Sequence, residues 1–107
     1  MVFVKASQKE IILKKFVFLT YGFERPTADI KEAWGKWFNS IKENVIEMGH
    51  FPRGRAFSKE GVTDLPLGRD SITGFLIVNA VSFEEAEKMV QRHPYVSSIR
   101  LYEIHAG

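Results

Sequence analysis

Two short runs of consecutive apolar residues place the strongest constraint on how this chain folds. Residues 16–19 read Phe-Val-Phe-Leu, and residues 74–78 read Gly-Phe-Leu-Ile-Val. Both runs are short and rich in β-forming residue types, so they indicate strands that are apolar on both faces. Each of these strands therefore needs a covering layer on both sides of its sheet.

The segment after the first run carries the pattern of a long helix. Pro26 and Thr27 begin it, and apolar residues recur at three- and four-residue spacing until Gly49, which is expected to supply a left-handed stop. Gly35 lies within this stripe, where we expect a point of close packing.

The second half of the chain repeats the alternation of strand and helix. Residues 50–57 are expected to form an edge strand and residues 58–70 a loop. A capping box at Ser82 and Glu85 opens the second helix, and a last strand covers residues 98–105. This order predicts a ferredoxin-like βαββαβ sandwich, an α+β fold whose four-stranded antiparallel sheet carries both helices on one face.

One face of such a sheet has no helix to cover it. Because the two central strands are apolar on both sides, that face would expose more apolar surface than a monomer normally tolerates. We expect a second copy to cover it, sheet against sheet around a two-fold axis, as in a dimeric α+β barrel. The domain of this homodimer comprises residues 14–107, and residues 1–13 are an extension that forms a short strand or a short helix.

Composition narrows the classes of partner. The 107 residues include 15 basic and 13 acidic side chains, for a net charge of +2, and no cysteine. A charge this close to balance argues against a nucleic-acid partner, and the lack of cysteine excludes a disulfide scaffold and a thiolate metal site. No apolar segment is long enough for a membrane span or an export signal, so we expect a cytoplasmic protein without a membrane partner.

Several short motifs occur together, in one order, along most of the chain. They are Phe16-Val-Phe-Leu, Trp34-x-x-Trp37, Gly74-Phe75, Glu85-Ala86-Glu87 and Arg92-His93-Pro94-Tyr95. In this order and spacing the chain resembles the YCII-related family, including its DGPF-type branch. The resemblance implies a small dimeric α+β barrel that binds or converts a small molecule in a cleft beside the dimer interface.

The resemblance does not extend to the catalytic pair of the better-known branch of that family. Phe38 stands where that branch has its histidine, and Glu47 stands where it has its aspartate. The DGPF-type branch instead has an acidic residue four positions before its Gly-Phe pair, which maps to Asp70. Its Asp-Gly-Pro-Phe run is replaced here by Asp64-Leu-Pro-Leu. The chemistry of the better-known branch is therefore not carried over.

His93 and Asp70 are the catalytic candidates. His93 ends the second helix, where the negative end of the helix dipole favours an imidazolium, and a histidine there fits a general acid or base. Asp70 offers a carboxylate for an acid and base pair. Both residues also fit structural roles, His93 as a helix cap and Asp70 as an ion-pair partner of Arg69. His50, His93 and His105 lack metal-ligand spacing, so no metal is expected.

Aromatic and arginine side chains are the candidates for ligand binding. They are Tyr21, Trp34, Trp37, Arg53 and Arg69. The aromatic residues suit the wall of a pocket, and they equally suit a helical core stripe. Arg53 and Arg55 suit a bidentate contact with a carboxylate-bearing ligand, and they equally suit the protection of an edge strand from aggregation.

The expected function is therefore the binding of a small molecule, with cofactor-independent proton abstraction and return by His93 and Asp70 if the chain is an enzyme. The alternative is a non-catalytic ligand-binding or interaction module. A remote alternative is an RNA-recognition motif, because residues 73–78 resemble its third strand. That module needs a second stacking aromatic residue where this chain has Ile77.

Overall fold

The computed structural model of the chain describes residues 12–22, 25–94 and 98–106. Its elements, in chain order, are β2 (Lys14–Tyr21), α1 (Ala28–Ile41), the short 3-10 helix η1 (Lys42–Asn44), β3 (Val45–His50), β4 (Gly54–Ser58), β5 (Gly61–Leu65), β6 (Ile72–Ala80), α2 (Phe83–Gln91) and β7 (Ser98–Ile104). The predicted extension at residues 1–13 lies almost wholly outside the described residues.

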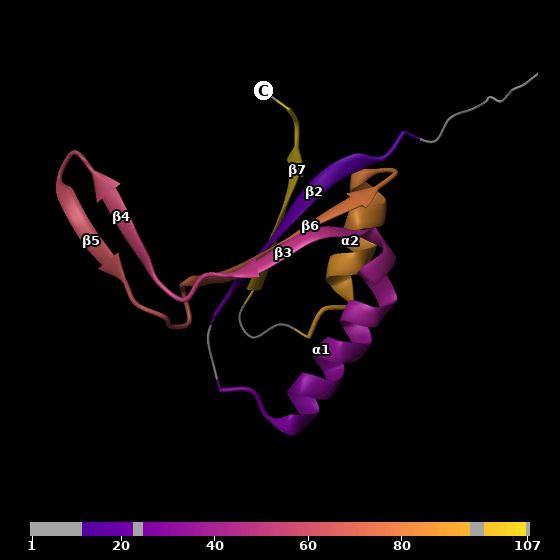
Figure 1. Cartoon of the computed structure of the whole chain (residues 1–107), viewed down its shortest axis with the longest axis horizontal. Coiled ribbons are helices and arrows are strands. Elements are labelled where there is room, and N and C mark those ends of the chain that lie inside the picture. Colours follow the sequence, from indigo (N-terminus) through magenta and orange to yellow (C-terminus); the bar gives the residue numbers. More distant parts are fainter. Residues whose placement is uncertain (1–11, 23–24, 95–97, 107) are drawn as a thin grey trace, which may run out of the picture.

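The main sheet has the strand order β3-β6-β2-β7, and every neighbouring pair is antiparallel. Both helices lie on one side of it (Figure 1). This arrangement confirms the predicted ferredoxin-like α+β fold. The two apolar runs form the central strands β2 and β6, which pair over their whole length from Lys14 opposite Ala80 to Tyr21 opposite Ile72.

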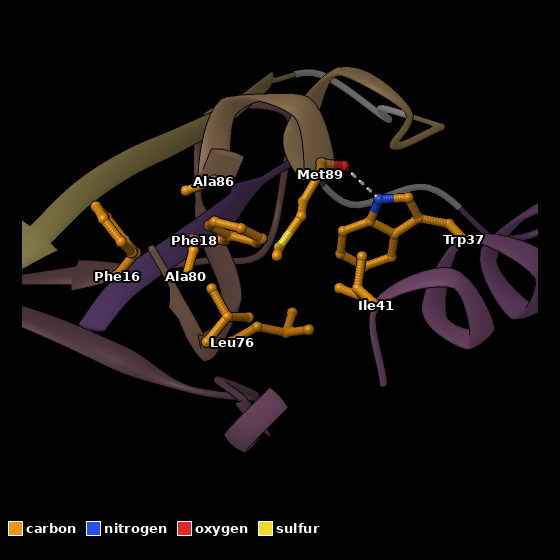
Figure 2. Packing of buried hydrophobic residues seen from close by; sticks show 9 residues of the cluster. Phe16, Phe18, Trp37, Ile41, Leu76, Ala80, Ala86 and Met89 are labelled. Atoms are coloured by element: carbon orange, nitrogen blue, oxygen red, sulfur yellow. Dashed lines mark hydrogen bonds between the residues drawn. The ribbon is translucent and has the colours of Figure 1, made fainter. Parts of the chain in front are cut away.

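The core lies between this sheet and the two helices. Alternate residues of β2 and β6 point into it because successive side chains of a strand face opposite sides. Figure 2 shows these residues meeting Trp37 and Ile41 of α1 and Ala86 and Met89 of α2. The buried residues of the sheet are Phe16, Phe18, Leu76, Val78 and Ala80. The core therefore uses one face of each central strand and leaves the other face outside.

The opposite face of the sheet, which we call the open face, is largely apolar, although Arg100 lies opposite Leu19 and Glu47 lies opposite Ile77. Val17 lies opposite both Ile77 and Tyr102, and Leu19 lies opposite Phe75. Tyr102 is 49% exposed. No helix or strand among the described residues covers this face (Figure 1). The sequence-based expectation of an uncovered apolar sheet face therefore holds for this chain taken alone.

Side-chain caps begin both helices. The Thr27 hydroxyl accepts a hydrogen bond from the Ile30 amide at 3.2 Å, and the Ser82 hydroxyl accepts one from the Glu85 amide at 3.1 Å. Both caps were expected from the sequence. The Glu85 carboxylate pairs with Lys88 at 3.0 Å.

The first helix is shorter than the sequence predicts. It ends at Ile41 instead of Gly49, and residues 45–50 form β3 at the edge of the main sheet. The Asn44 amide donates to the Asn79 carbonyl at 3.0 Å, which ties the end of the helical segment to β6. Gly49 lies opposite Phe75, and a Cβ at Gly49 would stand 2.5 Å from Phe75 Cε1. Gly49 thus permits a close ring contact and does not stop a helix.

Residues 54–65 form a β-hairpin, where the sequence analysis predicted an edge strand followed by a loop. Its strands β4 and β5 make a separate two-stranded sheet in which Phe57 lies opposite Val62 and Arg55 lies opposite Asp64. Gly61 has a φ of 131° next to the turn, a conformation that favours glycine. The hairpin leaves the sheet on the side away from the helices (Figure 1), and all of its strand residues are exposed.

Candidate functional site

A cavity of about 690 Å³, the first cavity, lies between α1 and one end of the main sheet. Most of its wall is apolar and aromatic. The aromatic residues that line it are Tyr21, Trp34, Trp37, Phe38, Phe51 and Phe75, together with the imidazoles of His50 and His93. The volume falls within the range of small-molecule sites, which are about 300–1,000 Å³ and mostly apolar.

Two tryptophan hydrogen bonds hold one wall of this cavity in place. The Trp37 indole N–H donates to the Met89 carbonyl at 2.7 Å, the bond drawn in Figure 2. The Trp34 indole N–H donates to the Pro94 carbonyl at 3.3 Å. These carbonyls lie in and just beyond the last turn of α2, where backbone oxygens lack helical partners. Both tryptophans therefore join α1 to α2 and also line the cavity, so the two roles considered for them coincide.

Gly35 lies between these tryptophans and also lines the first cavity. A Cβ at this position would meet nothing within 4 Å. The sequence-based expectation of a close packing point at Gly35 is therefore wrong. The small residue instead leaves space at the cavity wall.

His93 lies two residues beyond α2, and its imidazole forms part of the same wall. Its ring meets Trp37 edge to face, with centroids 4.4 Å apart. Burial lowers the pKa of His93 from 6.5 to about 4, because the charged imidazolium loses solvent. From its place at the end of a helix, His93 was expected to be favoured as an imidazolium by the helix dipole. Desolvation outweighs that effect, so His93 is neutral at pH 7.

Hydroxyl groups supply further polarity at the sheet end of the cavity. The Thr73 hydroxyl lies 3.2 Å from the Thr20 carbonyl, to which it donates, and also 3.2 Å from the Thr20 hydroxyl. Both threonines line the cavity. The two threonines were not among the predicted site residues, because they lie 53 residues apart and meet only through the pairing of β2 with β6.

A second cavity, of about 650 Å³, lies at the base of the hairpin. It is more polar, because Arg53, Arg55, Arg69 and Asp70 line it. Arg55 is engaged by Asp64, which accepts a hydrogen bond from its Nε at 2.8 Å. The two cavities adjoin, since they share the lining residues Tyr21, Phe51 and Leu67.

The structure divides the predicted site residues into two groups. His93, Trp34 and Trp37 line the first cavity only, and Asp70, Arg53 and Arg69 line the second cavity only. Tyr21 lines both. The predicted acid and base pair of His93 and Asp70 is therefore divided between adjoining cavities. His50 and the stacked rings of Phe51 and Phe75, whose centroids are 5.5 Å apart, were not among the predicted residues.

The described residues form neither a cluster of metal ligands nor a membrane-spanning helix. Across residues 12–22, 25–94 and 98–106, no group of three or more His, Cys, Asp or Glu side chains is placed to hold a metal ion. In the same part of the chain no helix has the length and apolar character needed to cross a membrane.

Comparison with known proteins gives a similarity of fold. No protein-family model matches the chain, and no curated protein sequence does. Among solved structures, the chain is similar to 5-chloro-2-hydroxyhydroquinone dehydrochlorinase (TftG) from Burkholderia phenoliruptrix AC1100, in complex with 2,5-dihydroxybenzoquinone. The TM-score is 0.54 at 17% identity, over 87% of this chain and 95% of that chain. The likeness is one of fold, and it places this chain on the same α+β scaffold as that dehydrochlorinase.

Proposed function

We propose that this chain binds a small planar ring compound in the first cavity and that His93 accepts a proton from the bound compound. The observation that carries the proposal is the aromatic wall of that cavity together with a neutral imidazole set into it. Flat apolar walls favour flat ligands, because aromatic rings gain from stacked and edge contacts beyond the burial of their area.

The neutral state of His93 determines its part in the chemistry. With a pKa of about 4 it is a neutral imidazole at pH 7, so its unprotonated ring nitrogen can take a proton from an acidic hydroxyl or from a carbon next to a carbonyl. The same imidazolium then returns the proton to another position on the ring compound, which completes an isomerisation or prepares an elimination. Neither step needs a cofactor.

Asp70 is proposed as the second acid and base group. A ligand that extends from the first cavity past Tyr21 would reach the second cavity, which Asp70 lines. In a homodimer, His93 of one copy and Asp70 of the other copy would offer a second way for the two residues to act on one ligand.

The similar dehydrochlorinase supports the class of ligand. Its complex contains 2,5-dihydroxybenzoquinone, a planar ring with acidic hydroxyl groups. We propose that this chain is a member of the YCII-related family and takes a ring compound of comparable size. The motifs from Phe16 to Tyr95 that resemble the family support this assignment.

Deuterium exchange tests the proposal without knowledge of the natural substrate. 2,5-Dihydroxybenzoquinone is incubated with the protein in D2O, and loss of its ring C–H signal is followed by proton NMR. The wild type is expected to accelerate exchange, and His93→Gln is expected to abolish the acceleration. His105→Gln is the matched control, because His105 is exposed and lines neither cavity.

The outcomes separate the two candidate functions. Binding with His93-dependent exchange supports proton transfer. Binding without exchange supports the non-catalytic ligand-binding module, which is favoured by the lack of any Asp or Glu side chain among the described residues that line the first cavity. Absence of binding overturns the proposal.

We also propose that the working unit is a homodimer formed through the open face. The apolar side chains of that face and the position of the hairpin support this assembly. An isolated two-stranded hairpin is at best marginally stable. The hairpin leaves the sheet on the side of the open face, with Phe57 74% exposed (Figure 1). A second copy seated on the open face would meet both surfaces.

A further inference from the structure

We infer that the second cavity is an anion subsite, which binds a carboxylate or a comparable planar oxyanion attached to the ring compound in the first cavity. The inference rests on the proposed function, because it assigns a substituent to the same ligand. It specifies that the ligand carries a negative charge and names the residues that select for that charge.

The charges around the second cavity favour an anion. Three guanidinium groups and one carboxylate, that of Asp70, line it. Asp64 is occupied by its 2.8 Å contact with Arg55. Arg53 forms no ion pair with any residue in the part of the chain that the structure describes. A guanidinium in a hollow, with its parallel N–H groups, suits the two oxygens of a carboxylate.

The wall between the cavities sets the geometry of the ligand. Phe51 lines both cavities, and its ring stacks on Phe75 with an angle of 15° between the planes. Arg53 follows Phe51 by two residues and lines the second cavity only. A ring held against the aromatic wall would therefore direct a substituent toward the arginines.

Arg100 adds to the positive potential near this wall through its contact with Tyr21. Tyr21 lines both cavities, and the Arg100 guanidinium carbon lies 4.7 Å from the centre of its ring. Arg100 lines neither cavity itself, so its charge acts from beyond the lining residues. Such a cation adds to the attraction of an anion in the adjoining space.

A matched pair of ligands isolates the effect of charge. 4-Hydroxybenzoate and 4-hydroxybenzamide have nearly the same shape, and only the first is an anion at neutral pH. We expect the wild type to bind the benzoate about tenfold or more tightly than the amide by calorimetry, the effect of one charge-assisted bidentate contact. Arg53→Gln is expected to remove most of this preference.

Lys59→Gln is the control, because it removes the same charge from the hairpin turn and Lys59 lines neither cavity. It should keep the preference for the benzoate. Circular dichroism of each variant verifies that it has folded. If every variant weakened the binding of both ligands by the same factor, the effect would be one of general charge and the anion subsite would be overturned.

A third probe separates this inference from the proposed function. Oxalate has planar carboxylates and no ring. If benzoate and amide bind equally, the anion subsite is overturned and the ring-binding proposal stands. If neither ring compound binds but oxalate binds with dependence on Arg53, the anion subsite stands and the proposed function fails. If no probe binds, both are overturned.

Discussion

The indole of Trp37 meets the imidazole of His93 edge to face, with ring centroids 4.4 Å apart and an angle of 82° between their planes. The same indole donates its N–H to the Met89 carbonyl in the last turn of α2. One tryptophan thus fixes the end of α2 and removes solvent from the histidine that follows it. The position of α1 and the protonation state of His93 are therefore linked.

The first prediction concerns the pH dependence of stability. The pKa of His93 is about 4 in the folded chain and 6.5 in the unfolded chain, so the unfolded state binds more protons between these values. Stability should therefore rise with pH from 4 to 6.5. After allowance for partial exposure, we expect about 1–2 kcal/mol of unfolding free energy to depend on His93 in this window.

Urea denaturation at pH 4.5 and pH 7 measures this effect. His93→Gln should reduce the difference in unfolding free energy between the two pH values. An unaltered pH dependence in His93→Gln would show that the imidazole is not held neutral by burial.

The second prediction concerns the tryptophan hydrogen bonds. Trp37→Phe removes the N–H that Met89 accepts and also leaves a gap in the buried core. We expect a loss of about 2 kcal/mol or more of unfolding free energy. Trp34→Phe should cost less, because its bond is 3.3 Å long and Trp34 is only partly buried. Equal losses for the two variants in denaturant titrations would contradict this ranking.

The third prediction contrasts two glycines. Gly49→Ala places a methyl group against the Phe75 ring, which must shift, so we expect a loss of about 1–3 kcal/mol. Gly35→Ala adds a methyl group to open space within α1 and should stabilise the helix by roughly 0.5–1 kcal/mol. Thermal unfolding midpoints that move in the same direction for both variants would count against the described environments.

The fourth prediction concerns assembly through the open face. Light scattering at micromolar concentration should give twice the chain mass of 12.3 kDa. Tyr102→Asp places a charge on the open face and should shift the protein to a monomer, as should Phe57→Asp in the hairpin. Asn39→Asp, on an exposed position of α1, adds the same charge and should leave the dimer intact. A monomeric wild type would refute the dimer.

Local patterns predicted the central strands and the helix caps because those features depend on adjacent residues. The uninterrupted apolar runs identified β2 and β6, and Thr27 and Ser82 marked the helix starts. The predicted end of the first helix at Gly49 was wrong for a physical reason. Val45 and Met48 fit the spacing of the helical stripe, but the β-branched residues at 45 and 46 also suit a strand. Pairing with β6 decided between the two.

The site was partly predictable. Aromatic residues on a helical stripe indicated Trp34 and Trp37 as wall residues, and both line the first cavity. The charge state of His93 was not predictable from its place at a helix end, because the desolvation comes from residues distant in sequence. The separation of Asp70 from His93 likewise depends on tertiary structure, since they line different cavities.

The two tryptophans provide the most direct test of the central claim, that the first cavity binds a small ring compound. The chain has two tryptophans, and both line this cavity, so two indole signals in a proton–nitrogen NMR spectrum report on it. Titration with 2,5-dihydroxybenzoquinone should shift both signals along saturable curves that give a single dissociation constant. Indole signals that stay fixed through millimolar concentrations of the compound would contradict the account.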